Sequence, residues 1–319
     1  MQDHLQSTKR PLVTIVSGCF NEAENIPELH RRISEVMMSM PRYEYEVLIA
    51  DNASTDATQE VIRSVAITDR RFKAIFNVRN FGHIRSSYHA MLQAQGDVVI
   101  LMASDLEDPP ELIRELLREW EDGFKVVAAV RRSTAETGLY PILRHIYYGL
   151  INRLSDVNMI ENYTGFGAYD KQVISILRQI NDPYPYLRGL VCELGFPIAR
   201  VPFDKPYRER GISKGTFYIY LDMALLGLVN HSKLPLRLSS LFGACVSLLS
   251  FAVGLFYLFM KLLFWESMQI GVAPVVVGMF FMMGVMLLML GLVGEYIALV
   301  VTHTLNRPLV VEKERLNFN

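Results

Sequence analysis

The stretch DVVILMASDLEDPPEL, residues 97–112, contains the pattern that decides the fold. Its first half is apolar and rich in valine and isoleucine, which is typical of a buried strand. A serine and three carboxylates follow within five positions, and two prolines then mark the start of a helix. The unit is therefore strand, polar turn and helix, with the carboxylates in the turn.

The same unit recurs along the first 130 residues. Strand-like runs occupy 11–17, 45–50, 72–77, 97–103 and 125–130. Helical patterns lie between them at Ile26–Met38, Thr55–Val65, Ile84–Ala94 and Glu111–Trp120. This alternation predicts an α/β fold in which helices flank a mostly parallel sheet.

Polar residues follow every one of these predicted strands. In such sheets ligands bind beyond the carboxyl ends of the strands, so these residues are the candidate site. The candidate residues at these strand ends are Cys19, Phe20, Glu22, Asp51, Asn80, His83, Ser104, Asp105, Glu107, Arg131 and Arg132. Some polar residues there have a simpler explanation, because Ser54, Thr55 or Asp108 at such a position can cap the following helix.

Composition and missing motifs exclude several classes of protein. A formal net charge of −1 offers no basic surface for nucleic acid. No G-x-G-x-x-G follows the first strand and no G-x-x-x-x-G-K-[ST] occurs, which disfavours a dehydrogenase or a P-loop nucleotidase. The three cysteines are too few and scattered for a disulfide framework or a zinc site, which fits a reducing compartment.

Asp105 and Glu107 are the candidate metal ligands. Carboxylates two positions apart on an extended segment point the same way, and Mg²⁺ commonly binds one or two carboxylates together with substrate phosphates. Basic residues that would surround a diphosphate are Arg131, Arg132, Arg208, Arg210 and Lys214. The alternative is a solvated turn that binds nothing.

The last third of the chain differs in character. Residues 238–260 and 269–294 contain no charged side chain, and each run exceeds the roughly 20 residues that a membrane-spanning helix needs. Lys233 and Arg237 precede the first run, and Arg307 follows the second. The positive-inside rule therefore places both termini in the cytoplasm. The alternative is a pair of buried core helices. The first ten residues lack an apolar segment, so no cleaved signal peptide is expected.

Several segments together resemble the family 2 inverting glycosyltransferases of GT-A fold. They are CFNEAENIPEL, ADNASTD, RNFGH, DLEDPPELI and RERGISK. With the two apolar runs and PLR…LLGLVGEYIALV, the chain is most similar to the polyprenyl-phosphate glycosyltransferases. These include bactoprenol glucosyltransferases, dolichol-phosphate mannose synthases and the undecaprenyl-phosphate aminoarabinose transferase.

The resemblance implies roles for many of the candidate residues. Cys19, Phe20 and Glu22 would line the base and ribose pocket, and Asp51 would contact the nucleobase edge. Asp105 and Glu107 would bind Mg²⁺ or Mn²⁺, and Asp105 would also be a catalytic residue. Arg210 and Lys214 would be catalytic residues. Together with Arg208 and Ser213, they would hold the donor diphosphate or the acceptor lipid phosphate.

The chain also departs from the family pattern. The first aspartate of the family D-x-D is Ala103, and the glutamine that follows the second is Glu107. A Gly-Asp-Phe-Arg element falls on Thr164-Gly165-Phe166-Gly167, so an aspartate sometimes assigned as catalytic base is replaced by Gly165. A phosphate monoester, whose second pKa is about 6, needs positioning more than deprotonation. A sugar hydroxyl would need a base, so the missing aspartate favours a phosphate acceptor.

These inferences predict a sugar transferase that moves a sugar from a nucleotide sugar, by analogy UDP-linked, to polyprenyl phosphate at the bilayer. The alternatives are a catalytically degenerate membrane scaffold and a processive polysaccharide synthase, whose Gln-x-x-Arg-Trp motif is absent. The resemblance also suggests a homo-tetramer. The expected organisation is a cytoplasmic GT-A domain (1–214), an interfacial amphipathic helix (215–234), two transmembrane helices (235–264 and 270–301) and a cytoplasmic tail (302–319). A packing helix of the catalytic domain is the alternative for 215–234.

Overall fold

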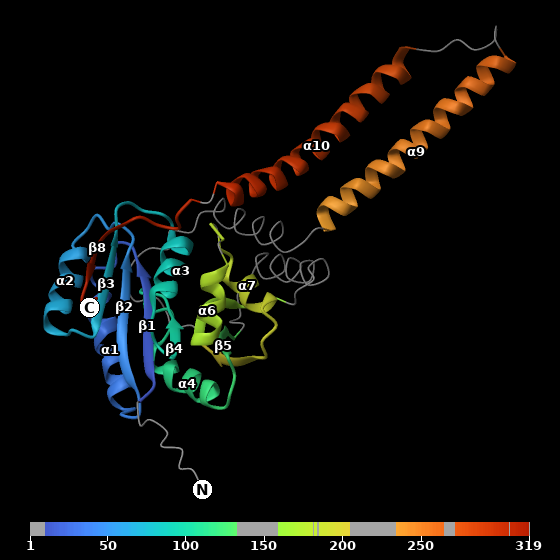
Figure 1. Ribbon diagram of the computed structural model, residues 1–319. Helices are drawn as coiled ribbons and strands as arrows, with labels where there is room; N and C mark the ends of the chain where they lie inside the picture. The colour runs from blue at the N-terminus through green and yellow to red at the C-terminus, as the bar shows by residue number, and fades with distance from the viewer. Residues whose placement is uncertain are drawn as a thin grey trace.

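The chain folds around one mixed, mostly parallel sheet (Figure 1). The computed structural model describes residues 10–132, 159–180, 182–183, 185–204, 234–264, 272–305 and 307–318. The strand order is β7-β5-β6-β4-β1-β2-β3-β8. The strands are β1 (Leu12–Cys19), β2 (Glu44–Asp51), β3 (Phe72–Asn77), β4 (Val98–Leu101), β5 (Val126–Arg131), β6 (Tyr163–Asp170), β7 (Ile198–Phe203) and β8 (Glu312–Leu316).

Helices cover both faces of the sheet. One face packs against α1 (Ile26–Met38), α2 (Thr58–Thr68), and α4 (Ile113–Glu121), which follows the short 3-10 helix η1 (Pro110–Leu112). The other face packs against α3 (His83–Gln93), α6 (Lys171–Gln179) and α7 (Leu187–Glu193). Because both faces are buried, the central strands are continuous apolar runs, as parallel strands usually are.

The five predicted strands and four predicted helices are all present, which confirms the predicted fold class. The patterns did not predict β6, β7, α6 or α7. Strand β6 lies antiparallel between β4 and β5, so the sheet is mixed. Its first residue, Tyr163, therefore lies at the edge where the parallel strands end.

Two long helices, α9 (Leu234–Leu263) and α10 (Val272–Thr304), extend together away from the sheet (Figure 1). Each contains an apolar segment long enough to cross a membrane, Ser239–Phe256 in α9 and Phe281–Thr302 in α10. Most of their described apolar side chains are exposed. Exposed apolar surface of this extent marks a contact with membrane or protein.

The chain returns to the sheet after α10. Residues 302–319 are predicted to form a tail, whereas the structure shows that β8 within them pairs antiparallel with β3. Arg63 on α2 donates two hydrogen bonds to Glu314, each 2.7 Å long. Alternating charged residues suit an edge strand because they discourage pairing with a further chain.

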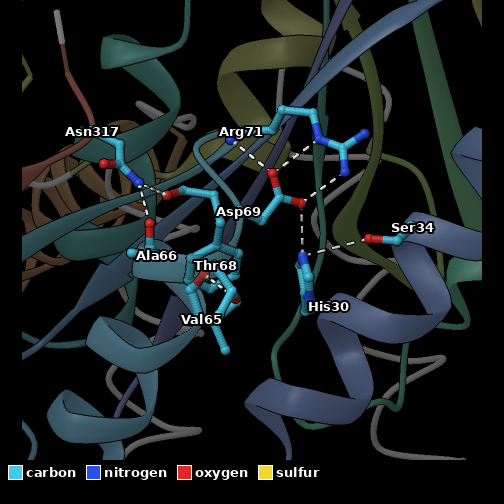
Figure 2. A network of polar contacts seen from close by, with 9 residues as sticks. His30, Ser34, Val65, Ala66, Thr68, Asp69, Arg71 and Asn317 are labelled. Atoms are coloured by element: carbon cyan, nitrogen blue, oxygen red, sulfur yellow. Dashed lines mark hydrogen bonds and ion pairs between the residues drawn. The ribbon is translucent and has the colours of Figure 1, made fainter.

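Polar contacts fix the corner between α2 and β3 (Figure 2). Asn317 Nδ2 donates to the carbonyl oxygens of Ala66 and Phe72, both at 2.8 Å. Asp69 accepts hydrogen bonds from the Arg71 guanidinium at 2.9 Å and lies 3.2 Å from His30 Nε2.

The group of Ser34, His30 and Asp69 contains the residue types of a hydrolase triad but not its geometry. Ser34 Oγ and Asp69 Oδ2 both approach Nε2 of His30, at 3.5 and 3.2 Å (Figure 2). A triad needs the acid and the nucleophile on opposite ring nitrogens. The group is therefore structural.

The Asp69 carboxylate should contribute stability that depends on pH. Burial alone would raise its pKa, but hydrogen bonds from Arg71 and His30 outweigh burial and lower the pKa from 3.8 to about 2. A depressed carboxyl pKa stabilises the fold above the ordinary pKa, and this stability is lost as pH falls toward the folded value. We expect Asp69→Asn to cost about 1–2 kcal/mol at pH 7 and progressively less between pH 4 and 2.

Thermal melts of the detergent-solubilised protein at pH 7 and pH 3 measure this difference. Asp122→Asn, the same change at an exposed position on the C-cap of α4, is the matched control and should leave the melting temperature unchanged. An equal loss of melting temperature for Asp69→Asn at pH 7 and pH 3 would contradict a stabilising role of the ionised Asp69 carboxylate.

Candidate functional site

Cys19 and Asp51 meet where the first two parallel strands end. The two residues are register partners, and Cys19 Sγ lies 3.9 Å from Asp51 Oδ1. Asp51 is fully buried and accepts hydrogen bonds from Gln59 Nε2 at 2.7 Å and from the Ser54 amide. Burial first, and then the neighbouring Asp51, raises the pKa of the Cys19 thiol, so the thiol is neutral and suits a packing or lining role.

The loop after β1 is bonded to the loop after β2. The Asn21 amide donates to Ser54 Oγ and the Glu22 amide donates to Thr58 Oγ1, both at 2.9 Å. Glu22 accepts a hydrogen bond from Asn25 Nδ2 at 2.5 Å, and Phe20 is half-buried in the same loop. The structure therefore brings Cys19, Phe20, Glu22 and Asp51 into one region at the edge of the sheet.

Three asparagines position the loop after β3. Asn52 Nδ2 donates to Asn80 Oδ1 at 2.8 Å, and Asn52 Oδ1 accepts from the Phe81 amide at 2.9 Å and from Asn77 Nδ2 at 3.2 Å. His83 follows this loop as the first residue of α3. Although His83 is exposed by accessible surface, loss of hydration and then the positive charge of Arg188 lower its pKa, which favours the neutral imidazole.

Asp105 and Glu107 lie in a tight turn directly beyond β4. The Glu107 amide donates to Asp105 Oδ1 at 3.1 Å, and Leu106 between them has a left-handed φ of 63°. Ser104 Oγ donates to the carbonyl oxygen of Gly18 at 3.0 Å, which joins this turn to the end of β1.

Asp108 does not cap the next helix. The described helix start has no side-chain cap, and the Asp108 carboxylate turns back to accept the Ala103 amide at 3.0 Å. Burial raises the pKa of Asp108 to about 6, although the Ala103 hydrogen bond and Arg131 oppose the shift.

The two arginines after β5 have different surroundings. Arg131 Nη2 lies 3.6 Å from Glu107 Oε2 and 3.5 Å from Asp108 Oδ1, so this arginine belongs to the carboxylate turn. Arg132 instead pairs at 3.0 Å with Asp204, which directly follows β7, and both side chains are exposed. Of the two predicted arginines, Arg131 lies beside the predicted metal ligand Glu107, whereas Arg132 pairs with Asp204.

The donor set of the turn fits a hard divalent cation. Within the described part of the chain, no three His, Cys, Asp or Glu side chains come together as a metal site. Two protein carboxylates are nevertheless sufficient for Mg²⁺ or Mn²⁺ when substrate phosphates complete the shell. Asp105 and Glu107 are oxygen donors of the required kind and lie beside a cationic group that suits phosphate.

The backbone around Gly165 and Gly167 accounts for the missing base. Gly165 has φ of +103°, a conformation that other residues adopt only with strain. A Cβ on Gly167 would lie 2.2 Å from the Val127 carbonyl oxygen of the neighbouring strand, so no side chain fits there. At neither position of β6 would the present backbone accept a side chain without strain or a shift.

Four predicted residues, Arg208, Arg210, Ser213 and Lys214, lie outside the described residues, as do residues 215–233 of the predicted interfacial helix. The roles of Asn52, Asn77 and Gln59 are not predicted by the sequence patterns. Asn52 and Asn77 lie next to or within strand ends, so their position was a usable signal. Gln59 lies eight residues beyond Asp51, and only the fold brings the two together.

A model of glycosyl transferase family 2 matches residues 14–177. An uncharacterized glycosyltransferase, YkcC of Bacillus subtilis, is 31% identical over 299 residues, which cover 93% of this chain and 92% of the relative. The bactoprenol glucosyl transferase of Shigella phage SfII is 29% identical over 303 residues, 95% of this chain and 97% of the relative.

Among solved structures, a mannosyltransferase from Pyrobaculum calidifontis in complex with GDP-Man and Mn²⁺ is 19% identical. The match covers 70% of this chain and 63% of that chain, with a TM-score of 0.48. The chain belongs to glycosyl transferase family 2, which confirms the resemblance, the GT-A fold class and the transferase activity that it implied.

Proposed function

We propose that the chain transfers a sugar, with inversion, from a nucleotide sugar to a polyprenyl phosphate at the cytoplasmic face of a membrane. The observation that carries this proposal is the turn with Asp105 and Glu107 beside Arg131, at the carboxyl edge of the sheet. Relatives whose names state bactoprenol glucosyl transferase align with about the whole chain, including both apolar helices, which supports the acceptor.

The donor would lie across the ends of β1, β2 and β4. Cys19, Phe20 and Asp51 would surround its base and ribose, and uridine is the base expected from the family resemblance. Asp105 and Glu107 would hold Mg²⁺ or Mn²⁺, which offsets the negative charge of the donor diphosphate. Arg131 is close enough to the turn to bind a phosphate oxygen in the same place.

The acceptor chemistry fits the absence of a side chain at Gly165 and Gly167. A phosphate monoester with a second pKa of about 6 is mostly a dianion at pH 7 and needs no protein base to attack the sugar. Positioning and charge compensation are then the main contributions of the protein. A hydroxyl acceptor would need a base at this edge of the sheet.

The membrane topology is part of the proposal. With α9 and α10 as an antiparallel pair of spans, the chain crosses the bilayer twice and returns to the side from which it left. The pairing of β8 with β3 supports this, because the residues after α10 join the same sheet as the residues before α9. The positive residues that flank the spans favour the cytoplasm for that side.

Transfer of labelled sugar to undecaprenyl phosphate in detergent, with a panel of nucleotide sugars, tests the function. Donor consumption should require both the lipid phosphate and a divalent cation. A chain that binds neither donor nor acceptor would instead be a scaffold. We expect Asp105→Asn to reduce turnover about 100-fold or more, because one carboxylate ligand of the proposed metal is lost.

Asp122→Asn, at an exposed site outside the candidate turn, is the matched control and should transfer sugar at the wild-type rate. Full turnover of Asp105→Asn with unchanged metal dependence would remove Asp105 from the mechanism.

A carboxylate restored at position 165 should not improve the enzyme. We expect Gly165→Asp to lower stability by about 1–3 kcal/mol, because its φ of +103° is strained for any side chain, and to leave turnover no higher than wild type. Thr164→Asp places the same charge on the exposed neighbouring residue and controls for electrostatics. Faster transfer by Gly165→Asp at equal protein concentration would show that a base is limiting.

A further inference from the structure

Asp108 is a buried carboxylate in the same turn as the candidate metal ligands Asp105 and Glu107. Its side chain is almost fully enclosed, with a relative exposure of 3%. Oδ2 accepts the Ala103 amide at 3.0 Å and Oδ1 lies 3.5 Å from Arg131 Nη2. The carboxylate therefore closes the turn from residue 103 to residue 108 on its inner side.

The turn that Asp108 closes is not a relaxed one. Leu106 has a left-handed φ of 63°, which costs a residue other than glycine free energy unless the surroundings hold it. Inside the turn, the Glu107 amide donates to Asp105 Oδ1. The Ala103 hydrogen bond ties the start of the turn to its end, so the positions of Asp105 and Glu107 depend on Asp108.

Arg131 connects the anchor to one of the ligands. Its Nη2 lies 3.5 Å from Asp108 Oδ1 and 3.6 Å from Glu107 Oε2, so one guanidinium spans both carboxylates. The turn contains three carboxylates, Asp105, Glu107 and Asp108, beside one guanidinium, so its formal charges sum to −2. That charge matches a divalent cation, whereas an unpaired Asp108 would leave an uncompensated buried charge.

We propose that Asp108 is a positioning residue that, together with Arg131, holds Asp105 and Glu107 in their metal-binding arrangement. Asp108 takes up the main-chain amide of Ala103, the position at which this chain lacks the carboxylate typical of its family. Asp108 does not touch the metal or the substrate. The inference rests on the proposed function, because it needs Asp105 and Glu107 to be the metal ligands.

Binding of Mn²⁺ to the full-length protein in detergent, without donor, tests this role independently of turnover. Free Mn²⁺ is measured by its electron paramagnetic resonance signal during a titration. Partners that orient metal ligands typically contribute 10–100-fold to metal affinity. We expect Asp108→Ala to weaken Mn²⁺ binding by about this factor, and D108N by about tenfold, because its amide oxygen still accepts from Ala103 but its charge is lost.

Asp170→Ala is the matched control. Asp170 is also a buried aspartate, and it accepts hydrogen bonds from Trp120 and Lys125 at the opposite edge of the sheet. It should lose stability in a thermal melt but bind Mn²⁺ as the wild type does. An equal loss of Mn²⁺ affinity in Asp170→Ala and Asp108→Ala would reduce Asp108 to a general contribution to stability.

The outcomes separate this inference from the proposed function. If Asp105→Asn weakens Mn²⁺ binding while both Asp108 variants retain wild-type affinity, the metal site stands and the role of Asp108 is overturned. If Asp105→Asn itself binds Mn²⁺ normally, the proposed metal site fails. Should Asp108→Ala not fold, D108N decides the question, since unchanged affinity in D108N contradicts the proposal.

Discussion

The register of β1 with its two parallel neighbours is the constraint on which the candidate site depends. Strands β1 and β2 end together, with Cys19 opposite Asp51. Strand β4 ends earlier, because its last residue Leu101 pairs with Val16. The next residues therefore run beside the end of β1, where Met102 and Ser104 bond to main-chain oxygens of Val16 and Gly18. The carboxylate turn thus lies at the level of the Cys19–Asp51 pair.

The opposite flank of β4 is constrained by close approach of main chains. Strand β6 runs so near β5 that Gly167 has no room for a Cβ, and Gly165 has a backbone conformation suited to glycine. At these two described positions, a side-chain base would therefore require backbone strain or a shift of the neighbouring strand. Of the two kinds of acceptor, a phosphate is the one that brings its own negative oxygen. The backbone geometry at Gly165 and Gly167 and the chemistry of the acceptor therefore both favour a phosphate acceptor.

The strands that could be predicted are those whose pattern is visible in the local sequence. Buried parallel strands are continuous apolar runs, so the first five strands and the polar residues after them were visible in the sequence. Strand β6, YTGFGAYD, carries two glycines and a threonine and lacks such a run. Strand β8, EKERL, is held by β3 and by Arg63, which is 251 positions from its partner Glu314. No local sequence pattern indicates contacts between residues so far apart in the chain.

The same limit applies within the site. Position after a strand was enough to select Asp105 and Glu107. The inward turn of Asp108 was not predictable, because aspartate before two prolines is equally suited to cap a helix. Asp108 bonds back into the turn because the Ala103 amide and Arg131 of β5 are its partners there. These groups come together only in the folded chain. Likewise Arg131 and Arg132 are adjacent in sequence, yet only Arg131 reaches the turn.

The return of the chain after α10 limits how far the sheet can lie from the proposed membrane. At 1.5 Å per residue, the 30 and 33 residues of α9 and α10 are about 45 and 50 Å long, whereas a hydrocarbon core is about 30 Å thick. Some turns of each helix must therefore extend beyond the core or tilt within it.

Helix α10 ends at Thr304, and the carbonyl oxygen of Pro308 already accepts a hydrogen bond from Arg85 of α3. Four residue steps span at most about 14 Å. Farther along, His89 and Gln93 of α3 contact Glu312 and Arg315. Because these α3 residues recur every four positions, one face of α3 is bonded to the returning chain. The helix that begins at His83 is thus fixed close to the end of the proposed span, where a lipid phosphate would arrive.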